Sequence, residues 1–324
     1  MLANSVKLVS LLFAFAATAA VAQQYPAKPI TIIVPAAAGG PSDAVTRVMA
    51  PALAKELKGT VVVENLGGAG GTVGAARFVR AAGDGYTLYL YHIANSTWPA
   101  LYRKLPFDVI SDFEPVGLIN DVPMMLVGKR DLAAKDFKEL LPWLKANTTK
   151  VMLGNAGIGS ASHLCGLLVT QAIQTALTPV PYKGTGPAMS DLLGGQIDLI
   201  CDQTTNTTSH VRAGKIKAYA VTTLSRLESM KDVPTLNELG LKNFELSAWH
   251  ALWAPKGTPK QIIEQLSRAL QVAIKDPNVT KTFADLGAVP VKEADATPGA
   301  LQARMKTEVA RWGPIIKAAG QYAD

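Results

Sequence analysis

A short strand that runs through a glycine turn into a helix constrains this chain most. Residues 30–34 read Ile-Thr-Ile-Ile-Val, Gly39 and Gly40 follow, and an amphipathic segment begins near Asp43. The first N–H groups of a helix lack internal partners and lie at the positive end of the helix dipole. Glycines let a ligand approach the main chain closely. The segment therefore predicts either an ordinary strand-to-helix turn or a site for a small anion.

The same turn lacks the features of a nucleotide site. No Lys-Ser or Lys-Thr pair follows Gly39 and Gly40, as it would in a loop that cradles a triphosphate. Asp43 is itself an anion, so we expect it to cap the helix and shape the loop, a role that Ser42 could share. Free N–H groups near Ala37, Gly39 and Gly40 would then bind a carboxylate.

The N-terminus has the pattern of a secretory signal peptide. Lys7 gives the positive start, residues 8–17 form an apolar core, and residues 20–22 read Ala-Val-Ala before Gln23. The apolar run is shorter than the ~20 residues of a membrane span, and no later segment is long and apolar enough to span. We expect residues 1–22 to be removed, leaving an exported, soluble protein without a lipid anchor.

Composition excludes several classes of function. The formal net charge is +7, but the lysines are scattered singly and aromatic residues make up only 6%, unlike the arginine stripes of nucleic-acid binders. Neither the four histidines nor Cys165 and Cys201 show metal-ligand spacing. We expect no nucleic acid, metal or cofactor. An exported protein could join the two cysteines, but we favour free, buried thiols.

Short apolar strands alternate with amphipathic helices, which predicts an α/β fold with a mainly parallel sheet. The roughly 300 residues that follow the signal peptide exceed one core, so two lobes are expected. The predicted strands are 30–34, 60–64, 87–91, 116–119, 124–128, 151–154, 178–181, 197–201, 217–223 and 249–254. The predicted helices are 43–57, 72–82, 136–146, 161–174, 187–193, 204–213, 259–274, 279–286 and 298–319.

Two segments have the pattern of crossings between lobes. Residues 120–125 join two strands with no helix between them, and residues 244–253 form a second extended segment. Two crossings predict one lobe built from residues 25–123 and 249–324, and an inserted lobe built from residues 124–248. Such a topology lets a hinge close over a ligand.

Two further loops carry motif-like residues. Residues 68–74 are spaced G-x-G-x-x-x-G and lack a suitable acidic partner, so a tight packing turn is favoured over a dinucleotide site. Ser160, Ser162 and His163 open a predicted helix. A hydrolase would need G-x-S-x-G, which is absent. A helix cap is the structural alternative, and ligand contact is the interpretation that we favour.

Asp198 and Asp202 flank the end of a predicted strand, and Gln203 follows. Their spacing along a strand separates the carboxyl groups by about 13 Å, which suits neither a glycosidase nor a metal pair. We expect Asp198 to be structural. Asp202 and Gln203 would line the cleft and orient a ligand hydroxyl, a protonated carboxyl group or a water molecule.

Histidines and aromatic residues supply further candidates. His92 and His163 lie in candidate binding loops and could donate to a carboxylate, whereas we expect His210 and His250 to be structural or exposed. Packing in the core is the commoner role of aromatic side chains. Those that could instead wall the pocket are Tyr182, Trp98 and Trp249.

Six motifs occur in order along the chain: V-P-x-x-x-G-G-x-x-D (34–43), V-E-N-x-x-G-A-G-G-x-x-G (63–74), D-G-Y-T-L (84–88), G-x-G-S-x-S-H-L (157–164), Y-x-G-x-G-P-A (182–188) and A-P-x-G-T-P (254–259). Together they make the chain resemble the Bug-type (TctC-like) periplasmic solute-binding proteins of tripartite tricarboxylate transporters. The resemblance covers essentially the whole mature chain. It implies a two-lobed periplasmic-binding-protein fold that captures a small organic carboxylate and delivers it to membrane permease subunits.

Two positions depart from the family pattern. Ala36 stands where the family often has an aromatic residue, which implies a larger pocket and admits a bulkier ligand, including an aromatic one. Trp98 stands where the family commonly has Asn before Pro99. The residues that we expect to contact the ligand are Ala36, Ala37, Gly39, Gly40, Ser42, Asp43, His92, Asn95, Ser96, Gly159, Ser160, Ser162, His163, Tyr182, Asp202 and Gln203.

We therefore hypothesise that each lobe presents a helix N-terminus to a di- or tricarboxylate, and that the protein is a periplasmic, monomeric receptor rather than an enzyme. A micromolar site needs about 8 kcal/mol. Five or six charge-assisted hydrogen bonds at about 1.5–3 kcal/mol each can supply it. Two alternatives remain: a sensor subunit that signals to a membrane kinase, and a secreted serine hydrolase that uses Ser160 or Ser162.

Overall fold

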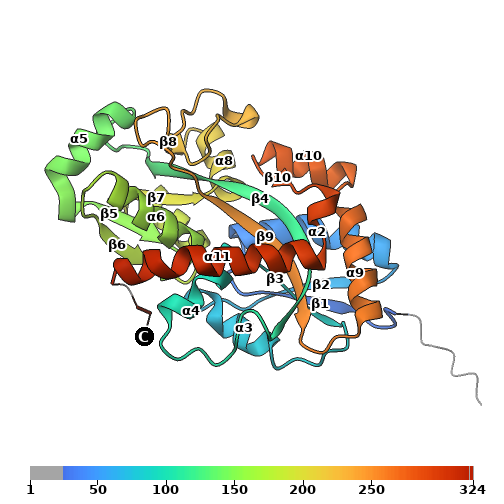
Figure 1. The fold of residues 1–324 in the computed structure, drawn as a ribbon. Helices are drawn as coiled ribbons and strands as arrows, with labels where there is room; N and C mark the ends of the chain where they lie inside the picture. Colours follow the sequence, from blue (N-terminus) through green and yellow to red (C-terminus); the bar gives the residue numbers. More distant parts are fainter. Residues whose placement is uncertain (1–24, 321, 324) are drawn as a thin grey trace, which may run out of the picture.

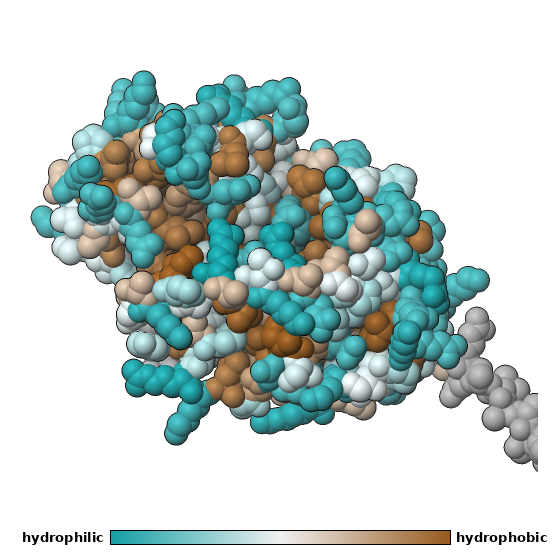
Figure 2. Space-filling view, viewed as in Figure 1, coloured by the Kyte–Doolittle hydropathy of each residue, from teal (hydrophilic) through white to brown (hydrophobic). Residues whose placement is uncertain are grey.

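The computed structural model describes residues 25–320, 322 and 323, and the predicted signal peptide lies outside them. These residues form a central sheet flanked by helices, as the predicted α/β fold class requires (Figure 1). The described helices include none with the length and apolar character needed to cross a membrane. Hydrophilic side chains are spread over the face seen in Figure 2, with apolar patches between them.

The first part of the sheet contains the N-terminal strands and two strands from the C-terminal region. Its strands are β1 (Ile30–Val34), β2 (Val61–Asn65), β3 (Thr87–His92), β4 (Phe113–Lys129), β9 (Ser247–Pro255) and β10 (Val289–Pro290). Their order is β2-β1-β3-β9-β4-β10. β2, β1, β3 and β4 run in one direction, whereas β9 and β10 run in the opposite direction.

The second part of the sheet is built on the far end of β4. Its other strands are β5 (Met152–Asn155), β6 (Thr178–Pro181), β7 (Leu199–Gln203) and β8 (Ile216–Val221). These four run in one direction, and β4 lies between β7 and β8 in the opposite direction. Most strands of each part thus run in one direction, as predicted. A strand that connects the two parts runs antiparallel to them: β9 in the first part and β4 in the second.

Helices cover the sheet on both sides (Figure 1). They are α2 (Pro41–Leu57), α3 (Thr72–Phe78), α4 (Trp98–Leu101), α5 (Phe137–Asn147), α6 (Ala161–Ala172), α7 (Thr185–Leu193), α8 (Thr204–Arg212), α9 (Lys260–Ala273), α10 (Pro277–Asp285) and α11 (Pro298–Ala318). α2 and α9 pack against each other beside the first part, and α6 packs on β5 and β7. α11 packs along β4 and α4.

Local sequence signals explain where several helices begin. The side chain of Asp136 accepts a hydrogen bond from the N–H of Glu139, and Glu139 accepts one from the N–H of Lys135. This pair resembles a capping box, with the returning bond made to the residue before the cap. The side chain of Thr297 caps α11 by accepting from the N–H of Ala300, and the proline that follows is favoured at the first helical position.

The predicted strands 116–119 and 124–128 are one continuous strand. β4 pairs with β9 from Phe113 to Pro123, and with β7 and β8 from Met124 onward. Leaving residues 120–123 out of the strand was wrong, because the chain stays extended there and Pro123 falls where the ladder with β9 ends and the ladder with β7 begins. The predicted helix 72–82 ends earlier, at Phe78, and neither α4 nor β10 was predicted.

The largest hydrophobic core contains buried residues from both parts of the sheet. In the first part, β1 is buried on both faces, and aromatic side chains of Phe78, Tyr89, Phe113 and Trp253 pack edge to face or tilted. Such pairs add stabilisation beyond their buried area. The second part packs residues of β4 and β7 against α7.

Cys165 of α6 and Cys201 of β7 form a disulfide, with their Cα atoms 5.8 Å apart. The prediction of two free thiols is therefore wrong, although both residues are buried as expected. Because 36 residues separate the cysteines in sequence, no local pattern predicts their pairing. The bridge ties the helix that opens at Ser160 to the strand that ends at Asp202 and Gln203.

We predict that replacing Cys165 and Cys201 together with Ala lowers the free energy of unfolding by about 3–4 kcal/mol. The unfolded chain then regains the freedom of a 36-residue loop. Urea denaturation of both forms measures the change, and wild-type protein in reductant should match the double variant. Equal stability of oxidised and reduced wild type would contradict the bridge.

Candidate functional site

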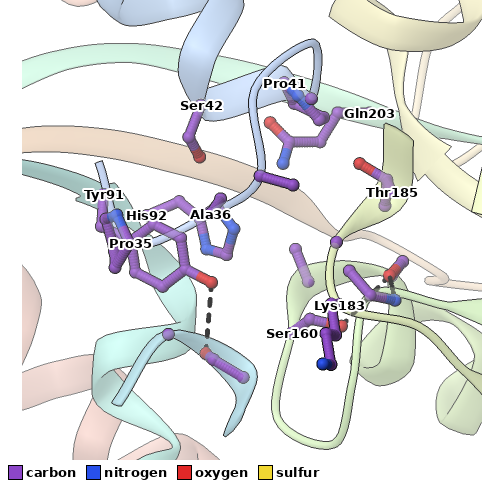
Figure 3. Close-up of a pocket in the computed structure, with 18 of the residues that line it drawn as sticks. Pro35, Ala36, Pro41, Ser42, Tyr91, His92, Ser160, Lys183, Thr185 and Gln203 are labelled. Atoms are coloured by element: carbon purple, nitrogen blue, oxygen red, sulfur yellow. Dashed lines mark hydrogen bonds between the residues drawn. The ribbon is translucent and has the colours of Figure 1, made fainter. Parts of the chain in front are cut away.

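One cavity lies between the two parts of the sheet, where loops leave the carboxyl ends of β1, β2, β3, β5, β6 and β7. Ligands of open α/β sheets bind at such strand ends. Figure 3 shows Ser42, Tyr91 and His92 on one side of this space and Ser160, Lys183 and Thr185 on the other. The lining residues are Pro35, Ala36, Ala37, Gly40, Pro41, Ser42, Gly68, Gly70, Gly71, Tyr91, His92, Ala156, Ser160, Ala161, Ser162, Lys183, Gly184, Thr185, Asp202 and Gln203.

Four helices begin at this cavity: α2, α6, α7 and α8. Within the described residues, the first N–H groups of each helix make no hydrogen bond to another main-chain group. Those from Ser42, Ala161, Thr185 and Thr204 are examples. Helix starts of this kind favour negatively charged groups. The arrangement can therefore hold a carboxylate with main-chain donors from both parts of the sheet.

Asp43 shapes the first loop instead of binding. Its Oδ2 atom accepts hydrogen bonds of 2.9 Å from the N–H of Gly39 and from Nε of Arg47. Burial acts to raise the pKa of Asp43, but the hydrogen bonds from Arg47 and Gly39 outweigh it and lower that pKa. The N–H of Gly39 is thus occupied, and that of Gly40 donates to the carbonyl of Ala37 at 3.4 Å, contrary to our expectation that both would bind the ligand. The N–H of Ala37 makes no such bond among the described residues.

Ser160 caps the second helix. Its Oγ accepts from the N–H of His163 and lies 3.1 Å from Oγ of Ser162, which accepts from the N–H of Ala156. The ring of His163 accepts through Nδ1 from the N–H of Gly159. These bonds fix the loop and leave neither serine beside a free base. The cap that we weighed as an alternative is present, and both serines also line the cavity.

Two buried histidines set the direction of hydrogen bonds on the α2 side. Nδ1 of His250 lies 3.0 Å from Oδ1 of Asn120, an acceptor, so this nitrogen carries the proton. Burial, followed by the proximity of His92, holds the pKa of His250 well below its usual value, and the ring is neutral. Its Nε2 therefore accepts from Oγ of Ser42, 3.3 Å away. The Ser42 hydroxyl retains lone pairs for the cavity.

His92 offers the cavity a hydrogen-bond donor, whereas the Ser42 hydroxyl offers lone pairs. Its Nδ1 accepts from the N–H of Ala94 at 3.1 Å, and burial lowers its pKa to about 3. The neutral ring therefore carries its proton on Nε2, which can donate to a ligand carboxylate. His92 thus has the hydrogen-bonding capacity that the sequence predicted, but as a neutral imidazole.

Asp202 is buried beside the cavity without a cation. Its Oδ2 accepts a 2.6 Å hydrogen bond from Nδ2 of Asn206. No described Lys or Arg forms an ion pair with it. Burial raises its pKa to about 7, although bonds from Asn206, Gln203 and Thr185 act in the opposite direction. Asp198 instead pairs with Lys129 and is structural, as expected.

Loops from the two parts touch across the cavity. A Cβ atom on Gly70 would lie 2.3 Å from the carbonyl oxygen of Ile158, and one on Gly184 would lie 3.1 Å from Cβ of Ala37. Only glycine allows these approaches, so the loop at 68–71 does more than pack a helix. It closes one edge of the cavity, and Tyr91 supports it by donating to the carbonyl of Gly70.

Several predicted site residues lie outside the cavity lining. Asn95 and Ser96 are buried behind it, where Asn95 accepts from Tyr89 and Ser96 donates to the carbonyl of Ile93. Tyr182 donates to Asp191 instead of facing the ligand space. The others outside the lining are Gly39, Asp43, Gly159 and His163, which shape the loops, and Trp98 and Trp249, which are fully buried in the core.

Sequence reasoning missed some of the lining. Tyr91 lies at the end of β3 and belongs to none of the six motifs. Lys183, Gly184 and Thr185 lie inside the Y-x-G-x-G-P-A motif, which was the available signal for them, and α7 begins at Thr185, two residues before the predicted start. Within the described residues, no cluster of three or more His, Cys, Asp or Glu could hold a metal ion.

A cavity between two sheet parts that is bordered by four helix starts is suited to hold a small ligand. The profile described as "Tripartite tricarboxylate transporter family receptor" (TctC) matches residues 45–321. This chain belongs to that family of Bug-type receptors.

Its relatives are binding proteins, not enzymes, and so is this chain. An Agrobacterium vitis protein from the TAR-I ttuE-ttuC' intergenic region is 55% identical, with 92% of this chain and 86% of that protein covered. The structure of periplasmic binding protein BugD has a TM-score of 0.90 and 47% identity, covering 92% of this chain and 99% of that one. MatC from Rhodopseudomonas palustris, solved with bound malate, has a TM-score of 0.86 and 36% identity, with coverage of 90% and 100%.

We predict that Asp202→Asn stabilises the ligand-free protein at high pH. A carboxyl group whose pKa is raised by folding, from 3.8 to about 7, stabilises the fold below pH 4 and loses that contribution as pH rises through 7. The stability of the variant relative to wild type should therefore grow between pH 4 and pH 8, by at most about 4 kcal/mol. Urea melts across this range measure it; a pH-independent difference would contradict the raised pKa.

Proposed function

We propose that this protein is an extracytoplasmic receptor that captures a di- or tricarboxylate between its two lobes and delivers it to the permease of a tripartite tricarboxylate transporter. The observation that carries the proposal is the convergence of four helix N-termini on one cavity. Family membership and the malate in MatC support it. The first part of the sheet would hold the carboxylate through the main-chain N–H groups of Ala37 and Ser42 and through Nε2 of His92, and the second through the starts of α6 and α7.

The chain would reach the periplasm through the signal peptide at residues 1–22 and act there as a monomer. Its lobes would be residues 25–123 with 249–324, and residues 124–248. The change of β4 partners between Pro123 and Met124 supports this division, as does the position of β9, which begins at Ser247. Since β4 and β9 connect the two lobes, bending of these strands would open the cavity.

We predict that calorimetry with a panel of aliphatic and aromatic carboxylates finds at least one ligand of micromolar or better affinity. Uncharged amides of the same acids should bind at least ~100-fold more weakly, because they lose charge-assisted hydrogen bonds worth about 1.5–3 kcal/mol each. Binding of the amides with no response to any acid would refute the carboxylate site.

We also predict that Gly70→Ala weakens binding of the best ligand at least ~10-fold by holding the two lobes apart. The new Cβ would lie 2.3 Å from the carbonyl oxygen of Ile158 on the opposite loop. Gly257→Ala is the matched control, since Gly257 also has a positive φ but nothing lies within 4 Å of its Cβ position. X-ray scattering should show ligand-induced compaction for wild type and the control. Full compaction of Gly70→Ala would contradict the closing contact.

A further inference from the structure

Helix α8 is polar in sequence but largely buried. Four of its nine residues are threonines, at positions 204, 205, 207 and 208, and each of them is at most 7% exposed. A buried helix is normally apolar, whereas a polar helix can bridge two domains. α8 packs on β7 and β8 in the second part of the sheet and against α2 in the first. Its composition therefore fits a contact between the two proposed lobes.

Two of these threonines donate hydrogen bonds from one proposed lobe to the other, at the end of α10 (Figure 1). Oγ1 of Thr204 donates to the carbonyl oxygen of Gly287 at 3.2 Å. Oγ1 of Thr208 donates to the carbonyl oxygen of Leu286, also at 3.2 Å. Carbonyl groups at the end of a helix lack partners within that helix. Gly287 has a positive φ, and a Cβ atom there would lie only 3.3 Å from Cβ of Thr204, so the two lobes meet closely at this point.

Hydroxyl groups at this boundary are compatible with both closed and open lobes. When the lobes separate, water can replace the carbonyl acceptors of Thr204 and Thr208 and can also bind the freed carbonyl groups. An apolar face would instead resist opening, because separation would expose it to water. Thr207 differs from both residues, because its Oγ1 donates within the second lobe, to the carbonyl oxygen of Gln203 at 3.3 Å. One helix thus contains two hydroxyl groups that bond across the boundary and one that does not.

We propose that Thr204 and Thr208 form a latch with the end of α10 that holds the two lobes closed around a bound carboxylate. The inference rests on the proposed function and on its division of the chain into lobes. Both threonines lie outside the cavity lining, so they are positioning residues that act on affinity through the closed fraction of the protein. α8 begins directly after Gln203, which does line the cavity. The helix that borders the ligand therefore also forms the latch.

The test replaces both threonines by valine, which has a similar shape and lacks the hydroxyl group. The double variant Thr204→Val, Thr208→Val should bind the tightest carboxylate of the calorimetry panel about 10- to 100-fold more weakly, because the closed state loses two buried hydrogen bonds. Stopped-flow kinetics should assign the change to faster release. Urea denaturation of the ligand-free variant should match wild type, since open lobes do not make these bonds. Thr204→Ser with Thr208→Ser keeps both donors and should bind with wild-type affinity.

Thr207→Val is the matched control, because it removes a buried threonine hydroxyl of the same helix that bonds within one lobe. It should lower the stability of the ligand-free protein and leave affinity unchanged. Unchanged or tighter binding by the double valine variant would overturn the latch and leave the carboxylate receptor intact. So would a large loss of its ligand-free stability, which would assign both hydroxyl groups to a permanent core. Failure of every carboxylate to bind wild type would reject the proposed function, and the latch with it.

Discussion

Everything at the candidate site depends on where parallel strands end. In each part of the sheet, the strands that run in one direction bring their carboxyl ends to the same edge, and the helices that follow begin there. The helix dipoles contribute only about 0.3–2 kcal/mol each. Directional hydrogen bonds from main-chain N–H groups contribute more, so the geometry of the loops decides how well a carboxylate is held.

Strands β4 and β9, which connect the two parts of the sheet, also contact this cavity through a chain of hydrogen bonds. Asn120 of β4 and His250 of β9 stand opposite each other in the ladder, and their hydrogen bond fixes the ring that accepts from Ser42. Ser42 belongs to α2 and faces the ligand space. Two buried hydrogen bonds therefore join a cavity hydroxyl to the strands that would bend on opening, which orients the hydroxyl without giving it a nucleophile's role.

The sequence predicted the elements that local rules determine. The strand–turn–helix units at Gly39–Gly40 and at Ser160 place half of the cavity lining, because turn glycines and helix caps act within a few residues. Contacts between distant segments were not predictable in this way. The disulfide joins residues 36 apart, and Lys183 reaches the cavity only because β6 and α7 pack beside β5. Asn95 lies outside the cavity lining, because it is buried and bonds Tyr89, and such an asparagine has the same local pattern as one that faces a ligand.

Because few of the residues that line the cavity carry a formal charge, charge alone cannot select the ligand. A buried arginine would attract any dicarboxylate by its charge, whereas Lys183, the cavity's one lysine, is exposed and its field is screened by salt within about 8–10 Å. Discrimination must then come from the pattern of donors and acceptors. The uncharged main-chain donors at the helix starts, which come from both parts of the sheet, are the part of that pattern that the cavity lining shows.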